Sequence, residues 1–284
     1  MSDLVIDHGN PWWLSPDVWV VPAANPNEAS PGAQSPVAGQ QYLATANVHS
    51  QAATGVQYGT VYFFWADPSL SITTANANAI GSSQVSVNAG QAQITQCANP
   101  WIPTLLPNGS GHECLVAAVV ENTGPGQVGP PPANLDGNND PTVGQHNLGV
   151  VTMSPHMQGQ FIYPFQIFNG ERVERAFEIL AERAPLEQAR PFLRGLPGGE
   201  GILKEPGKLG RFGIVTKPRP SPEECERLEP SVPKLKLGSH EKAWFSVVGT
   251  VEGGAALIHV TQRLDGRVIG GLSVLVLPET KKES

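Results

Sequence analysis

The residues GTVYFFWA at positions 59–66 carry the strongest β-strand signal in the chain. Aromatic and β-branched side chains suit a pleated, half-buried surface. Because side chains alternate along a strand, Val61, Phe63 and Trp65 are expected on one face and the two aromatic residues between them on the other. The segment therefore predicts a strand, which Asp67 and Pro68 end.

Further short strands are predicted around this segment, separated by Gly- and Pro-rich turns. A continuous apolar run at residues 114–120 is typical of a central strand of a sandwich. About seven short strands with turn signals between them is the number in an immunoglobulin-like sandwich. The other predicted strands of this half are residues 17–21, 42–49, 85–87, 91–95 and 148–151.

The second half of the chain predicts another sandwich. Asp265-Gly266 lies between apolar runs and favours a type I′ hairpin, and Asn169-Gly170 is a further tight-turn signal. Residues 171–184 fit a helix or a strand, residues 185–196 predict a short helical turn, and residues 198–201 predict a flexible turn. Strands are predicted at residues 161–168, 212–215, 243–248, 255–262 and 268–277.

The chain is therefore predicted to be all-β, with two tandem immunoglobulin-like β-sandwich domains at residues 1–155 and 156–284 and a short helical insertion in the second. The composition agrees, because 284 residues suffice for two domains and 31 Gly and 27 Pro suit many short strands joined by turns. Lys and Arg are concentrated after Gly170, which indicates two domains with different surfaces.

An ordered set of anchors runs through the first half: Tyr42, Val48-His49, residues 61–68, Ile80-Gly81, Gly90, residues 101–103, residues 112–115 and residues 145–148. This order resembles bacterial immunoglobulin-like domains of the CARDB type, over residues 15–153. The resemblance implies a fibronectin-type-III-like sandwich with a structural or binding role and no catalytic residues. The family has an Asn-x-Gly turn after the second strand, where this chain has Ser50-Gln51-Ala52.

The sequence lacks the nucleophile elbow, the P-loop, the dinucleotide-binding glycines and the His-Glu-x-x-His motif, so a non-enzymatic protein without a cofactor is predicted. Asp136, Asn138 and Asp140 concentrate the oxygen donors that Ca²⁺ prefers. Their spacing lacks the terminal Glu of an EF-hand, and an Asx-rich turn without an ion explains the same residues.

The three cysteines do not form a disulfide framework. Cys97 and Cys114 are predicted to be buried thiols, and a single bridge between them is the alternative. A zinc site formed by these two cysteines with His112 and Glu113 is a further alternative.

Two pairs of aromatic residues are candidates for interaction. Trp12 and Trp13 lie in an irregular arm before the first strand, where they pack against their own domain or dock on a partner subunit or a glycan. Tyr62 and Phe64 are the candidate residues for the flat aromatic platform that a carbohydrate-binding module would need.

The leading prediction is a non-catalytic structural or adhesive interaction protein that binds a protein partner or another copy of itself. A carbohydrate-binding module and a component of a phage-like or contractile injection particle are the alternatives. The net charge of −7 without a basic cluster argues against nucleic acid, and no apolar stretch reaches membrane-spanning length. The start lacks a signal peptide, which predicts a cytoplasmic location, export without a classical signal, or a place within a particle.

Overall fold

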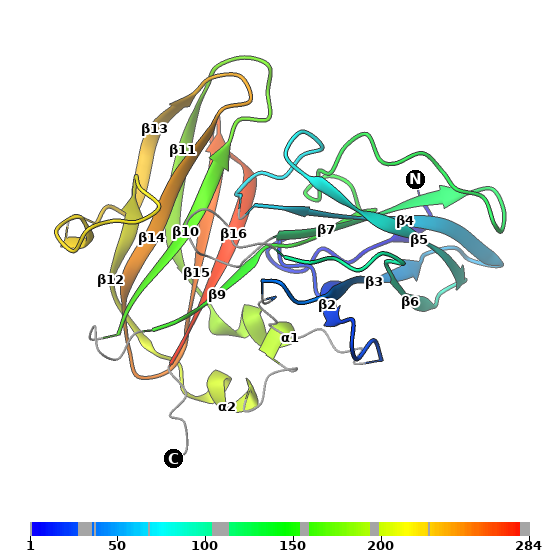
Figure 1. Cartoon of the computed structure of the whole chain (residues 1–284), viewed down its shortest axis with the longest axis horizontal. Coiled ribbons are helices and arrows are strands. Elements are labelled where there is room, and N and C mark those ends of the chain that lie inside the picture. The colour runs from blue at the N-terminus through cyan, green and yellow to red at the C-terminus, as the bar shows by residue number, and fades with distance from the viewer. Residues whose placement is uncertain are drawn as a thin grey trace. The chain divides into compact units, whose positions relative to one another are not determined.

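The computed structural model describes residues 2–27, 36, 38–67, 69–103, 114–153, 159–193, 199–226 and 228–278. The chain is mostly β, with 54% strand and 7% helix, and its contacts divide it into two units. Each unit is a β-sandwich, which confirms the predicted fold class (Figure 1). The first unit contains the described residues up to 67, from 72 to 103 and from 114 to 147, and the second contains residues 69–71 and those from 148 onward.

One sheet of the first sandwich is built around the strand β3. Two strands, β1 and β2, pair with one edge of β3, and β6 pairs with the other. Alternate residues of β3, from Tyr42 to Val48, are buried in the core, so that Asn47 and His49 lie on the outer face. The strands are β1 (Leu4–Val5), β2 (Val18–Pro22), β3 (Tyr42–Ser50) and β6 (Ala92–Gln96).

The other sheet of the first sandwich has the order β5-β4-β7-β8. Residues 59–66 lie in β4, and Val61 and Phe63 enter the core between the sheets as predicted. Phe64 and Ala66 face outward, where they pack with Leu135 in a smaller apolar cluster. The strands are β4 (Val56–Ala66), β5 (Asn78–Asn88), β7 (Cys114–Asn122) and β8 (Val143–His146).

The prediction that residues 148–151 close the first domain is wrong. The closing strand is β8, and β9 (Leu148–Thr152) pairs in parallel with β16 (Arg267–Leu277) in the second unit. One residue, Asn147, separates β8 from β9. A short apolar run predicts that a strand is buried, but it does not predict to which sheet the strand belongs.

The second sandwich has a three-stranded sheet of order β10-β14-β12 and a five-stranded sheet of order β13-β11-β15-β16-β9 (Figure 1). Pro164 lies in the edge strand β10, where its missing N–H does not interrupt the sheet. The strands not yet bounded are β10 (Gln160–Phe168), β11 (Arg175–Ala184), β12 (Lys208–Val215), β13 (Ser231–Leu237), β14 (Lys242–Glu252) and β15 (Ala256–Leu264).

Residues 69–71 belong to the second unit although they follow β4 of the first in the sequence. The Leu70 amide donates to the Gln166 carbonyl at 3.1 Å, next to an isolated parallel bridge between Ser69 and Gln166. Leu70 is 1% exposed and lies in the main core of the second sandwich. This core is therefore completed by a residue that is distant in the sequence from its strands.

The two predicted tight turns differ in the structure. Asp265 and Gly266 have φ values of 51° and 77°, as a two-residue type I′ loop between β15 and β16 requires. Asn169 instead follows β10 where the chain passes to the other sheet, and its buried amide contacts the carbonyl oxygens of Val173, Leu237 and Gly238 at 2.8–3.1 Å. The Asn169-Gly170 signal thus marks a connection between sheets and not a hairpin.

The segment that fitted a helix or a strand is the strand β11, and the predicted helical turn is present as η2 (Leu186–Ala189) and α1 (Arg190–Leu193). The prediction of a flexible turn at residues 198–201 is wrong, because Gly199–Lys204 forms the short helix α2. Two of these six residues are glycines, which disfavour the helical conformation, so the sequence pattern did not predict this helix. Among the described residues, no helix is long and apolar enough to cross a membrane.

We predict that the substitution Leu70→Ala destabilises the second sandwich by about 2–5 kcal/mol, because it opens a cavity in that core. Hydrogen exchange of the full chain in urea is the measurement, and faster exchange is expected in β10 and β16. The matched control is Ile72→Ala, since Ile72 is 5% exposed in the outer cluster of the first sandwich. The control should affect β4 and β7, and an identical pattern for both variants would contradict the assignment.

Candidate functional site

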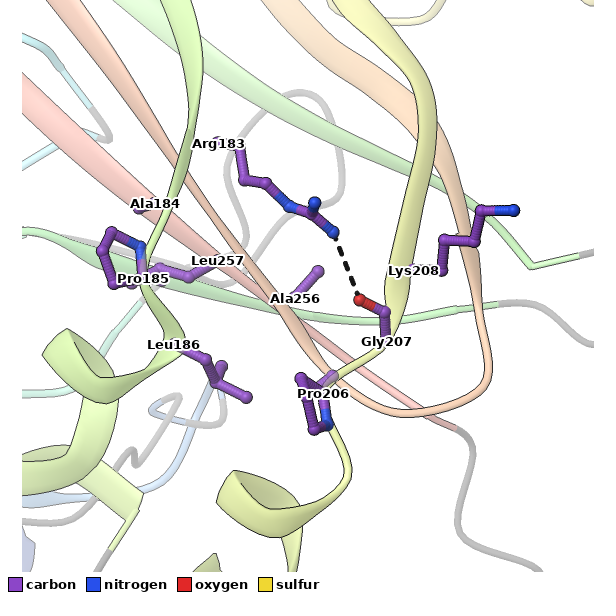
Figure 2. A pocket seen from close by; sticks show the side chains of 10 residues that line it. Arg183, Ala184, Pro185, Leu186, Pro206, Gly207, Lys208, Ala256 and Leu257 are labelled. Carbon is purple, nitrogen blue, oxygen red and sulfur yellow. Dashed lines mark hydrogen bonds between the residues drawn. The ribbon is translucent and has the colours of Figure 1, made fainter.

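A groove of about 600 Å³ lies at one end of the second sandwich, where β11 ends and where β12 and β15 begin (Figure 2). Its buried part is apolar and includes Ala256 and Leu257. Pro185, Leu186 and Pro206 add further apolar surface from the ends of the neighbouring strands. This combination of an apolar floor and an open mouth is suited to holding an exposed segment of another molecule.

Two cations line the groove, and no carboxylate is among its described lining residues. Arg183 extends from β11 toward β12, and its guanidinium donates a long hydrogen bond of 3.4 Å to the Gly207 carbonyl (Figure 2). Lys208 lies opposite Glu252 in the ladder between β12 and β14, but Glu252 does not line the groove. The groove therefore favours a negatively charged ligand group next to apolar ones.

The predicted tryptophan arm packs on its own sandwich. Trp13 is 4% exposed and Trp12 is half-buried, and their rings meet edge to face at 5.5 Å. The Asn147 amide donates to the Trp13 carbonyl at 2.9 Å, which ties the arm to the residue after β8. Of the two alternatives, the structure therefore places this pair against its own domain.

Tyr62 and Phe64 do not form an open aromatic platform. Both side chains are half-buried, and the Tyr62 hydroxyl donates to the Gly129 carbonyl. Phe64 packs against the outer cluster that contains Leu135. The connection between β7 and β8 thus covers the face on which a sugar ring would have to stack.

Asp136, Asn138 and Asp140 use their side chains and backbone in turns. The Asp136 carboxylate accepts from the Asn138 amide at 3.1 Å and from Asn139 Nδ2 at 2.7 Å. The Asp140 carboxylate accepts from the Thr142 amide at 2.9 Å and from its hydroxyl at 2.6 Å. The geometry is that of the Asx-rich turn, which was the alternative to a calcium site.

Cys97 and Cys114 are buried thiols without a disulfide. Cys97 lies in the core between the sheets, and burial raises the pKa of its thiol. Cys114 lies in the outer cluster and contacts the Asn147 side-chain oxygen. The other two members of the alternative zinc site, His112 and Glu113, lie outside the described residues.

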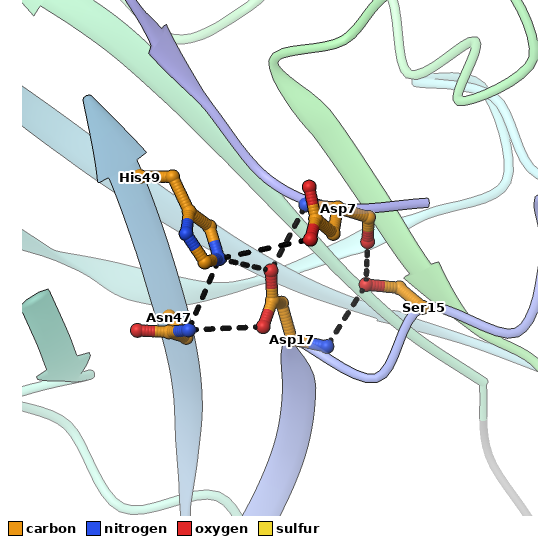
Figure 3. Close-up of polar contacts among 5 residues, drawn as sticks. All are labelled: Asp7, Ser15, Asp17, Asn47 and His49. Atoms are coloured by element: carbon orange, nitrogen blue, oxygen red, sulfur yellow. Dashed lines mark hydrogen bonds and ion pairs between the residues drawn. The ribbon is translucent and has the colours of Figure 1, made fainter. Parts of the chain in front are cut away.

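A polar cluster that the sequence analysis did not identify lies on the outer face of the first sandwich (Figure 3). It contains Asp7 of the arm, Asp17 just before β2, and His49 of β3. His49 Nε2 is 2.7 Å from Asp17 Oδ2 and 3.9 Å from Asp7 Oδ2. Asn47, two residues before His49 on the same face, donates to Asp17 Oδ1 at 3.0 Å.

A partly buried serine–histidine contact occurs in the second sandwich. Ser273 Oγ is 2.8 Å from His259 Nδ1, and His259 Nε2 is 2.7 Å from the Gln188 side-chain oxygen. A neutral imidazole with its proton on Nε2 satisfies both contacts. Ser273 is 0% exposed, so its hydroxyl is not open to a substrate. The contact of His259 with Gln188 links η2 to the sheet.

No family model matches the chain, and no curated protein sequence matches it. Among solved structures, red sea bream transglutaminase is 10% identical with a TM-score of 0.23, and the match covers 93% of this chain and 31% of that chain. The CupB6 tip adhesin from Pseudomonas aeruginosa is 11% identical with a TM-score of 0.26, and the match covers 97% of each chain. A bacterial adhesin from Mobiluncus mulieris is 6% identical with a TM-score of 0.26, over 93% of this chain and 98% of that chain.

This chain thus spans about a third of the length of the transglutaminase. Because the identities and TM-scores are low, no functional residue is carried over from these proteins.

We predict a loss of stability in acid that arises separately in each sandwich. Burial lowers the pKa of His146 in β8 and of His259 in β15 to about 4, against about 6.5 for an unfolded histidine. The unfolded chain then binds more protons between these values, so stability is complete above pH ~6.5 and falls as the pH drops toward ~4. For His146, which is 7% exposed, the loss is about 3 kcal/mol.

The measurement is a urea titration at several pH values, followed by a short exchange pulse at one common pH. His146→Gln should flatten the pH dependence of the first sandwich alone, and His259→Gln that of the second alone. An unchanged pH dependence in both variants would show that other groups cause the acid sensitivity.

Proposed function

We propose that the chain is a non-catalytic structural or adhesive protein whose partner is a second copy of itself. In this proposal the first sandwich is a CARDB-type module, and its acidic surface docks on the groove of the second sandwich of another copy. The observation that carries the proposal is the groove itself, with its apolar floor and with Arg183 and Lys208 but no carboxylate among its described lining residues.

The charge distribution supports a second copy as the occupant. All 18 Lys and Arg residues follow residue 171, and nine Asp and Glu residues precede it. The first sandwich therefore has no lysine or arginine to neutralise its carboxylates. Several of these carboxylates are exposed, including Asp3, Asp7 and Glu121. Opposite surfaces of this kind attract one another and fix the orientation of association.

The two contact surfaces are different, so the association is head to tail. Such contacts continue into a filament unless the rotation between copies closes a ring. This geometry also agrees with a structural component of a larger particle. The carbohydrate-binding alternative has less support, because Tyr62 and Phe64 are half-buried under their own loop.

We predict concentration-dependent self-association that weakens as salt is raised, because salt screens charges at the rim of an interface. Sedimentation velocity of the full chain at low and high salt measures it. The double variant Arg183→Glu, Lys208→Glu should associate about tenfold or more weakly, since it opposes carboxylates to carboxylates.

The matched control is Lys234→Glu with Arg267→Glu, which makes the same change of net charge at two exposed residues outside the groove. The control should associate as the original chain does. A chain that stays monomeric at high protein concentration and low salt would overturn the proposal, as would equal effects of the two double variants.

A further inference from the structure

We infer that Asp7, Asp17 and His49 form a binding site for a transition-metal ion of the Zn²⁺ type on the first sandwich (Figure 3). The three side chains come from three separate segments, and their ligand atoms lie within 4.8 Å of one another. One imidazole nitrogen and two carboxylate oxygens are donors that zinc accepts. Ca²⁺ prefers six to eight oxygen ligands, so this set favours a transition metal.

The separations are close to those of a tetrahedral site. Ligand atoms about 2.0–2.1 Å from zinc lie about 3.3 Å from one another in that geometry. His49 Nε2 is 2.7 Å from Asp17 Oδ2 and 3.9 Å from Asp7 Oδ2, so one separation is shorter than this value and the other longer. Small rotations of the side chains bring both near it. His49 binds the ion through Nε2 as a neutral imidazole whose proton lies on Nδ1.

Hydrogen bonds hold Asp7 and Asp17 in place before any ion binds. The Asp7 amide donates to Asp17 Oδ2 at 3.0 Å, and the Asn47 amide donates to the Asp17 carbonyl at 2.9 Å. The Ser15 hydroxyl donates to the Asp7 carbonyl, and the Asp17 amide donates to Ser15 Oγ at 3.2 Å. Asn47 Nδ2 donates to Asp17 Oδ1, which orients the carboxylate as an outer partner of a metal ligand does.

The charge of the unit also favours a cation. The Asp17 side chain is 11% exposed, and no lysine or arginine exists in the first 171 residues to pair with it. His49 is the side chain that faces both carboxylates. A divalent ion neutralises both at once, where a protonated His49 supplies a single positive charge.

The fourth position of the ion is open to solvent. The Asp7 side chain is 65% exposed, and Asp7 also lines an open pocket of about 340 Å³ together with His8 and Gly9. Water or a side chain from a partner completes the coordination there. The ion joins the arm that carries Asp7 to the strand that carries His49, so it stabilises the attachment of the arm.

The test is a titration of the full, untagged and chelator-treated chain with Zn²⁺ alone in a calorimeter, at high salt so that association is screened. One ion per chain is expected. Co²⁺ should give the visible spectrum of a four-coordinate nitrogen and oxygen site, a readout that does not depend on stability. Loss of an outer partner of a metal ligand alone costs about 10–100-fold in affinity, so Asp7→Asn and His49→Gln should each bind zinc at least about tenfold more weakly.

The matched control is Asp136→Asn, which removes a carboxylate that is hydrogen-bonded within its own turn in the same sandwich. It should bind zinc as the original chain does. If His49→Gln does not fold, Asp7→Asn decides, because its side chain is mostly exposed. Absence of zinc binding by the original chain, or equal binding by Asp7→Asn, would overturn the inference. Either result is distinguishable from a failure of the self-association proposal, because that proposal is tested through Arg183 and Lys208 of the groove, which are not ligands of the ion.

Discussion

The carboxylates of the first sandwich have to be satisfied without lysine or arginine, because all 18 such residues follow residue 171. Much of this sandwich shows the consequence. Asp17 accepts from a backbone amide, from Asn47 and from His49, and Glu121 accepts from the amides of Asp3 and Leu4. Carboxylates that would be ion-paired in another protein here cap turns and fasten the N-terminal arm. Backbone amides thus donate the hydrogen bonds that side-chain cations donate in other proteins.

The sequence predicted those elements whose signal is local. The alternation of side chains within residues 59–66 was enough to predict a strand there. The Asp265-Gly266 loop was predicted from two residues that accept positive φ. For the strand β9 and for Leu70, the local sequence did not predict the sheet or core to which each belongs. Each has an apolar character that predicts burial, but each is buried by strands far away in the sequence. Sheet membership is a long-range property, so no window of sequence contains it.

The site residues divide in the same way. Asp136, Asn138 and Asp140 lie together in the sequence, and the carboxylates of Asp136 and Asp140 accept hydrogen bonds from within that turn. Asp7, Asp17 and His49 are separated by up to 42 residues, and they meet because β1 and β2 both pair with β3. Two signals for them were in the sequence: the missing cations, and the spacing of Asn47 and His49, which puts both on one face of a strand. The groove around Arg183 has no such signal, because it forms where three strands begin or end.

The two sandwiches share one class of fold but differ in how their carboxylates are neutralised. The second pairs its acids with arginine and lysine, as in the contacts of Arg175 with Glu171 and of Arg190 with Glu187. Exposed pairs of this kind contribute little to stability, so their value lies in the surface that they leave. A surface of mixed charge can present a local excess of cations, as the groove does, whereas the first sandwich can present carboxylates alone. The fold does not dictate a function to either one. The difference in charge is the basis both of the proposed docking of one sandwich on another copy and of the proposed cation site on the first sandwich.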